Sequence, residues 1–130
     1  MIFQVTFIDN INDCTVNGHK IDKTVIIDSL NHETISELMK NNSWYGERLR
    51  YNYKNIIDVI SVKYQNISHI IKSFSIENDS LIGNIEILDN KQGRMLKKFI
   101  LKNKAKFKLR AILNYMESRL HIISFDWMLK

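Results

Sequence analysis

The chain has 130 residues, of which 45% are hydrophobic and 25% are charged, and its formal net charge is +5. This length and composition predict one folded domain over residues 1–130 and exclude a disordered or low-complexity protein. No apolar run is long enough to cross a bilayer or to form the core of a signal peptide, so we expect no membrane partner.

In chain order, strand signals come first and helix signals follow. The β-prone segment Ile2–Ile8 predicts an opening strand, and Asn17-Gly18 is a dipeptide typical of tight turns. From Asp22 to Asn41, apolar residues recur at helical spacing. This spacing predicts one broken helix or two short ones, with Asn31 available to restart the helix midway.

Strand signals dominate the second half of the chain, after an expected loop over residues 41–50. The predicted elements are strands over residues 55–63, 67–76, 81–88, 105–112 and 119–129, a turn over residues 77–80, and a helix over residues 91–103 capped by Asp89 or Asn90. The fold class that follows is α+β. We expect about six mostly antiparallel strands forming a barrel-like sheet, with two or three helices packed on it.

The net positive charge comes from one stretch of the sequence. Lys91–Arg110 contains nine basic residues and no acidic residue, whereas the rest of the chain is net negative. The asymmetry indicates an acidic partner, either nucleic acid or an acidic protein. Ala105–Ile112 also alternates as a half-buried strand does, with Arg110 on the same outer face as the lysines, so a basic face that merely meets solvent is the alternative. The residues assigned to partner binding are Lys97, Lys98, Lys104, Lys106 and Lys108.

Recognisable catalytic and metal-binding motifs are missing from the sequence. The four histidines are scattered, the single cysteine cannot form a zinc site by itself, and the four glycines form no phosphate-binding loop. We therefore expect no metal and no small-molecule cofactor. A serine protease site could draw on Ser68, Ser73, Ser75 or Ser124 and the histidines, but none of these serines lies in a recognisable nucleophile turn. Examples of such a site are Ser68 with His69 and Ser124 with His121.

Five segments, in order along nearly the whole chain, resemble the prohead core maturation proteases of large tailed phages, which have the herpesvirus-assemblin type of fold. Asn17–Leu30 is similar to the family's Asn-x-Arg-x-Tyr-Pro segment, and Trp44–Asn52 to its Gly-Glu-Leu-x-His-Pro element. Asn66–Ile100 is similar to its strand, turn, Gly-containing strand, Leu-Asp-Thr-x-x-Gly corner and helix. Phe107–Ile112 falls at its Ser-Ser-Arg-Gly strand, and His121–Leu129 at its closing Phe-Asp strand. The resemblance implies an assemblin-like fold.

At the two positions that decide activity, the sequence departs from that family. Arg50 stands where the resemblance places the catalytic histidine, and a guanidinium that stays protonated cannot accept a proton from serine. Lys108 and Leu109 stand where it places the nucleophilic serine. Arg110 matches the arginine that helps to stabilise the oxyanion in the family. The resemblance therefore implies a catalytically degenerate homologue, a pseudo-protease.

A degenerate protease fold suggests a binding role. The first hypothesis is a non-catalytic structural or assembly protein of a phage head, such as a minor capsid, decoration or core component. It would contact the major capsid or scaffold protein in many copies, in the virion head and in the host cytoplasm during assembly. The alternatives are a nucleic-acid-binding protein that uses residues 91–110, with Tyr51, Tyr53 or Trp44 stacking on bases, and an active serine protease with a relocated site.

Overall fold

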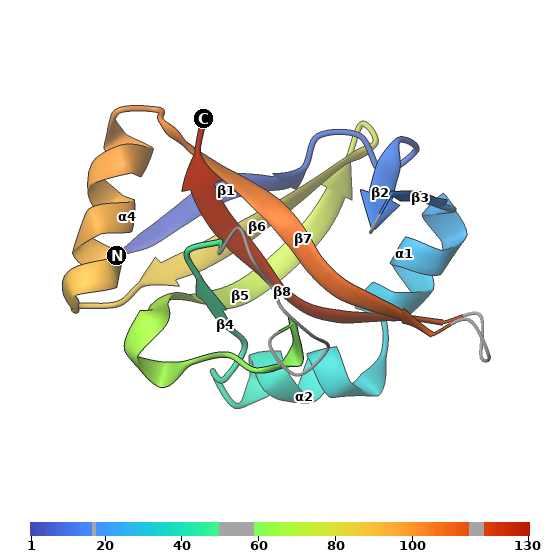
Figure 1. Cartoon of the computed structure of the whole chain (residues 1–130), viewed down its shortest axis with the longest axis horizontal. Coiled ribbons are helices and arrows are strands. Elements are labelled where there is room, and N and C mark those ends of the chain that lie inside the picture. Colours follow the sequence, from blue (N-terminus) through green and yellow to red (C-terminus); the bar gives the residue numbers. More distant parts are fainter. Residues whose placement is uncertain (17, 50–58, 115–118) are drawn as a thin grey trace.

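The structure is a computed structural model that describes residues 1–16, 18–49, 59–114 and 119–130 (Figure 1). Its first half contains the strands β1 (Ile2–Ile8), β2 (Cys14–Val16), β3 (His19–Ile21) and β4 (Tyr45–Glu47), and the helices α1 (Lys23–Leu30) and α2 (Glu33–Lys40). Its second half contains the short 3-10 helix η1 (Tyr64–Asn66), the strands β5 (Ile67–Glu77) and β6 (Ser80–Ile87), the helix α4 (Lys91–Leu101), and the strands β7 (Ala105–Asn114) and β8 (Arg119–Leu129).

The strands form one antiparallel sheet and two hairpins. The sheet has the order β1-β6-β5-β4, and the hairpins are β2-β3 and β7-β8. In Figure 1 the long β7-β8 hairpin crosses the four-stranded sheet, α4 lies at the left end of the molecule, α1 lies at the right end, and α2 lies along the lower edge. The α+β class and the mostly antiparallel pairing are thus as the sequence predicts.

The predicted barrel-like sheet is wrong in one respect, because the sheet is not closed. β1 and β7 pack against each other, yet no ladder of hydrogen bonds joins them in the described part of the chain. β7 pairs only with β8 there, and the resulting hairpin lies across the sheet, joined to it by a bridge between Arg48, just after β4, and Trp127 of β8. The structure also has more strands than the six expected, because β2, β3 and β4 are only three residues long and give almost no periodic signal.

Two local predictions differ from the structure. The helix restarts at His32, whose Nδ1 accepts a hydrogen bond from the Thr34 N–H, whereas Asn31 ends α1. A strand is predicted over residues 55–63, but the described part of this range contains no strand. Val59 and Ile60 are helical, and residues 61–63 have no regular structure. Residues 55–58 lie outside the described residues. The apolar spacing in this segment suits either element, so periodicity alone could not decide.

Most other boundaries follow from short-range chemistry. Asn90 caps α4 by accepting from the Gly93 N–H at 2.7 Å. Asn78 and Asp79 both have positive φ, which suits the tight turn between β5 and β6. No helix in the described segments is both long and apolar enough to span a membrane.

The core lies between the four-stranded sheet and the β7-β8 hairpin. Phe7 of β1 stacks on Phe125 of β8, with ring centroids 4.4 Å apart, and meets Phe107 of β7 edge to face at 5.7 Å. Trp44, just before β4, packs on Phe125 from the other side at 6.1 Å and is itself 1% exposed. This aromatic cluster joins the two layers and fixes how β8 crosses the sheet.

Gly83 of β6 leaves the space that the Phe7 ring fills, so we predict that Gly83→Ala is strongly destabilising. A Cβ at this position would overlap the ring, and the expected loss in free energy of unfolding is about 1–3 kcal/mol. Gly18→Ala is the matched control: Gly18 has a φ of 80°, but a Cβ added there would have no atom within 4 Å, so it should lose only about 1 kcal/mol. Chemical denaturation measures both. An equal or larger loss in Gly18→Ala would contradict the packing argument.

Candidate functional site

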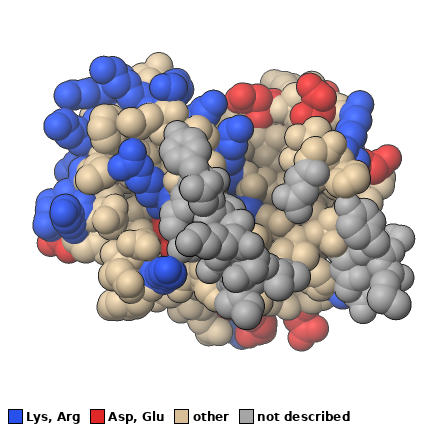
Figure 2. Space-filling model, in the orientation of Figure 1, with Lys and Arg blue, Asp and Glu red and all other residues tan. Residues whose placement is uncertain are grey.

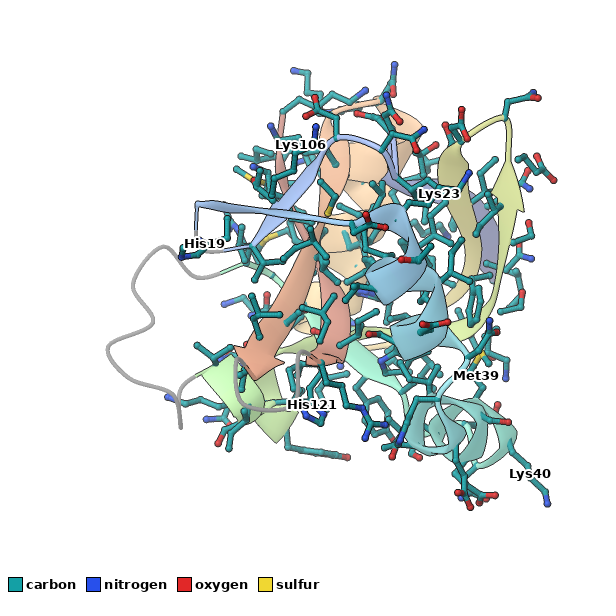
Figure 3. The ribbon with its side chains drawn as sticks, turned by 90° about the vertical axis from the view of Figure 1, so that its right-hand side faces the viewer. His19, Lys23, Met39, Lys40, Lys106 and His121 are labelled. Carbon is teal, nitrogen blue, oxygen red and sulfur yellow. The ribbon has the colours of Figure 1, made fainter. Side chains whose placement is uncertain are left out.

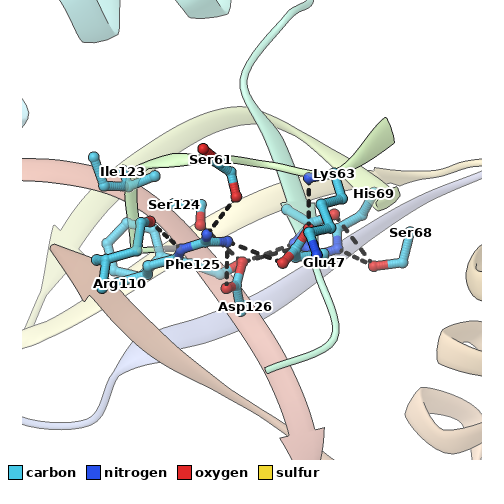
Figure 4. A network of polar contacts seen from close by, with 12 residues as sticks. Glu47, Ser61, Lys63, Ser68, His69, Arg110, Ile123, Ser124, Phe125 and Asp126 are labelled. Atoms are coloured by element: carbon cyan, nitrogen blue, oxygen red, sulfur yellow. Dashed lines mark hydrogen bonds and ion pairs between the residues drawn. The ribbon is translucent and has the colours of Figure 1, made fainter. Parts of the chain in front are cut away.

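The most distinctive feature of the interior is a buried guanidinium. Arg110 of β7 is 2% exposed, and its Nη1 lies 3.1 Å from Glu47 Oε1 and 3.3 Å from Asp126 Oδ2 (Figure 4). Its Nε and Nη2 donate to the backbone carbonyls of Val59 and Ser61 at 2.6 and 2.7 Å. The arginine therefore ties β4, β7, β8 and the segment before η1 together.

Glu47 and Asp126 are each fully buried and have further donors. The Ser124 hydroxyl and the Glu47 N–H both donate to Asp126 Oδ1, at 2.7 and 3.1 Å, and the Lys63 N–H donates to Glu47 Oε2 at 3.1 Å. Buried carboxylates require such partners, because an unpaired charge in an apolar interior is costly. Glu47 points into this cluster at a β-bulge, where the pairing of β4 with β5 shifts register after Gly46.

A second buried polar pair, Ser68 and His69 of β5, lies beside this cluster (Figure 4). His69 Nε2 lies 2.9 Å from the Phe125 carbonyl oxygen, which can only accept, so Nε2 carries the proton. Nδ1 then accepts from the Ser68 hydroxyl at 2.7 Å. The ring lies directly against Gly46, where any Cβ would overlap it. Burial lowers the pKa of His69 from 6.5 to about 4, so the imidazole is neutral.

The two serine–histidine pairs suggested from the sequence are arranged differently in the structure. Ser68 and His69 are in contact, but both are 0% exposed, so their hydrogen bond meets no solvent. Ser124 is also 0% exposed and donates to Asp126, whereas His121 is exposed, and no hydrogen bond joins Ser124 to His121 although both are described. In this conformation the cluster pairs buried charges with each other and satisfies buried polar groups inside the core.

The site positions predicted from the resemblance differ in their surroundings. Arg50 lies outside the described residues. Lys108 is exposed and Leu109 is half-buried, on opposite faces of β7, while Arg110 is buried. The prediction that Arg110 lies on the solvent face with Lys106 and Lys108 is therefore wrong. The alternation is correct, but the segment before η1 and the end of β4 cover that face at Arg110.

The other basic residues of Lys91–Arg110 gather at one end of the molecule. Lys98, Lys104, Lys106 and Lys108 are exposed and Lys97 is half-buried. Figure 2 shows this concentration of basic side chains over α4 and the start of β7. Of the aromatic residues suggested for base stacking, Trp44 is buried in the core and donates from Nε1 to the Ile123 carbonyl, so it is not available; Tyr51 and Tyr53 lie outside the described residues.

Sequence reasoning missed the two acidic partners of Arg110. Glu47 and Asp126 belong to the Gly-Glu and Phe-Asp elements of the resemblance, yet neither was singled out. The available signal was an acidic residue inside an apolar strand, as in Ser124-Phe125-Asp126-Trp127, because buried acids nearly always have a basic partner. Among the described residues, no group of three or more His, Cys, Asp or Glu side chains could hold a metal ion.

The fold, a four-stranded sheet crossed by a long hairpin, is similar to that of a phage capsid protease. One solved structure that matches is that of the bacteriophage T4 capsid assembly protease, gp21, with a TM-score of 0.59 and 11% sequence identity. The match covers 98% of this chain and 93% of the other. No family model and no curated protein sequence matches the chain. At this level of identity, the likeness shows the fold.

We predict that Arg110→Met lowers the free energy of unfolding by about 3–5 kcal/mol, because it leaves Glu47 and Asp126 buried without their cation. The matched control is Lys108→Met, an exposed basic residue on the same strand, which should stay within about 0.5 kcal/mol of the wild type. Denaturant unfolding measures both. The triple variant Arg110→Met/Glu47→Gln/Asp126→Asn, which removes these three charges together, should regain part of the loss; no regain would contradict an electrostatic origin.

His69 makes stability depend on pH. Its pKa is about 4 in the folded state and about 6.5 when unfolded, so unfolding takes up a proton between these values. The contribution is fully present above pH 6.5 and is lost as the pH falls to about 4, a loss of about 3 kcal/mol. We predict that His69→Asn unfolds with a shallower pH dependence than the wild type over this range. His121→Asn, at an exposed histidine, should keep the wild-type slope; equal slopes in all three proteins would refute the assignment.

Proposed function

We propose that this chain is a non-catalytic structural or assembly protein of a phage head, a minor capsid, decoration or core component. The observation that carries the proposal is the pairing of a protease-like fold over almost the whole chain with side chains unsuited to the reaction. Lys108 and Leu109 stand at the expected nucleophile position, and Arg50 at that of the base. A protein that keeps the fold without these groups is a pseudo-protease.

The surroundings of Arg110 support the loss of activity. In acyl transfer, a guanidinium that stabilises an oxyanion must point donors at a space that substrate can enter. Here the Arg110 donors point to Glu47, Asp126 and two backbone carbonyls, and the side chain is 1% exposed. The same residue type at the matched position therefore has a structural role, which is to hold the core together.

The basic end of the molecule supports docking on an acidic protein. The lysines of α4 and β7 have no ion pair with any described residue, so their charge is available to a partner. In a phage head, that partner would be the major capsid or scaffold protein, bound in many copies. The protein would be in the virion after being made in the host cytoplasm.

A second candidate, nucleic-acid binding, is favoured by the same charge. Lys97, Lys98, Lys104, Lys106 and Lys108 would contact phosphates, and binding would weaken steeply with added salt. Trp44 and Arg110 are buried, so neither side chain can contact a nucleic acid, and this function loses two of its expected contacts. DNA binding is therefore the weaker of the two candidates.

Quantitative mass spectrometry of purified mature phage particles tests the proposal. We expect the intact chain at a fixed copy number relative to the major capsid protein, as symmetric incorporation requires. Absence from mature particles would contradict a virion component.

Labelling with a serine-directed fluorophosphonate tests the pseudo-protease assignment separately. We expect no adduct on the purified folded protein, because Ser68 and Ser124 are buried. Matched samples of Ser68→Ala and Ser124→Ala identify the site if an adduct forms. An adduct that either substitution abolishes would mean an active protease with a relocated site.

A further inference from the structure

Two unpaired strand edges meet at one groove on the basic end of the molecule. β1 is the terminal strand of its sheet, and β7 bonds only with β8 in the described part of the chain. Residues 4–6 of β1 and 105–107 of β7 line the same groove, which has a volume of about 600 Å³. This volume is in the range of sites that hold small ligands, roughly 300–1,000 Å³, and suits a few residues of an extended chain.

The backbone of β1 is ready to pair with another strand. The Met1 carbonyl accepts from the Ile87 N–H, and in an antiparallel pair alternate residues direct both backbone groups to the partner. Phe3 and Val5 therefore bond with β6, whereas the N–H and C=O groups of Gln4 and Thr6 point away from it. No described residue forms a hydrogen bond with these backbone groups of Gln4 or Thr6.

The lining of the groove combines apolar surface with positive charge. Ile100, Ala105 and Phe107 are apolar residues of the lining, and Lys106 and Lys130 are its basic residues. Figure 3 shows Lys106 at the end of the hairpin opposite to His121. Among the residues that line the groove, Asp9 is the single acidic one. Lys104, which precedes the lining residue Ala105 in the sequence, is exposed. An incoming strand would therefore meet both apolar and basic partners.

We propose that this groove binds an extended, acidic polypeptide segment of another protein, which adds as a strand to the free edge of β1. Strand addition takes its affinity from backbone hydrogen bonds and its specificity from alternate side chains. The segment that fits here alternates acidic with apolar residues. A nucleic acid lacks the alternating N–H and C=O groups that Gln4 and Thr6 would pair with. The inference rests on the proposed function only in naming a head protein as the source of the segment.

The first test is binding of a fluorescein-labelled octapeptide, Glu-Val-Glu-Val-Glu-Val-Glu-Val, measured by fluorescence anisotropy. We expect saturable binding that Lys106→Glu/Lys130→Glu weakens by about tenfold or more. The matched control is Lys91→Glu/Lys98→Glu, which makes the same charge change on exposed residues of α4 outside the groove. No binding, an equal loss in both variants, or tighter binding of oligo(dT) than of the peptide would overturn the proposal.

Amide hydrogen exchange on the unmodified protein tests the strand pairing itself. Saturating peptide should slow exchange of the Gln4 and Thr6 amides, while the Phe3 and Val5 amides are already protected by β6. Unchanged exchange at Gln4 and Thr6 with peptide bound would overturn the proposal. Mass spectrometry of particles is independent of both measurements, so failure of the docking site and failure of the virion assignment are distinguishable.

Discussion

The buried ion pairs of Arg110 are the constraint on which much of the structure depends. A guanidinium inside a core must have its donors satisfied, and here two carboxylates and two carbonyls from three separate parts of the chain accept from it. The short strand β4 has only three residues and one neighbour in its sheet. Glu47 holds β4 against the β7-β8 hairpin, because its N–H donates to Asp126 and its carboxylate pairs with Arg110.

The same cluster relates the fold to its proposed loss of chemistry. Active sites hold polar groups in strained or incompletely paired surroundings, so that substrate can complete them. In this chain the Ser68 hydroxyl bonds with His69, and the Ser124 hydroxyl bonds with Asp126. His69 and Asp126 also bond with backbone groups. Polar residues that could serve catalysis are here used to stabilise the contact between the sheet and the hairpin. A charged centre of this kind favours a single arrangement of the layers, because any shift would leave a charge without its partner.

Long elements with clear periodicity could be predicted from the sequence, and short or covered ones could not. β1, β5 and β8 were expected close to their observed bounds, since alternation and turn residues mark them. The place of Arg110 could not be predicted, because its position in the alternation is the same as that of Lys108. Only a distant segment distinguishes them, by covering one and not the other. Of the two acids that pair with Arg110, Asp126 comes from the neighbouring strand β8, whereas Glu47 lies 63 residues away in sequence. An acidic residue inside an apolar strand is the signal for Asp126, but the sequence does not indicate which basic residue it meets.

The pairing of β1 with β6 has a consequence for how the chain folds. Synthesis completes β1 long before β6, and Phe7 can enter the core only when both β6 and β8 are present. Closing so long a loop delays the contact, because non-local pairings form only after the entropy of loop closure has been overcome. During that interval both edges of β1 are unpaired and its apolar face is uncovered.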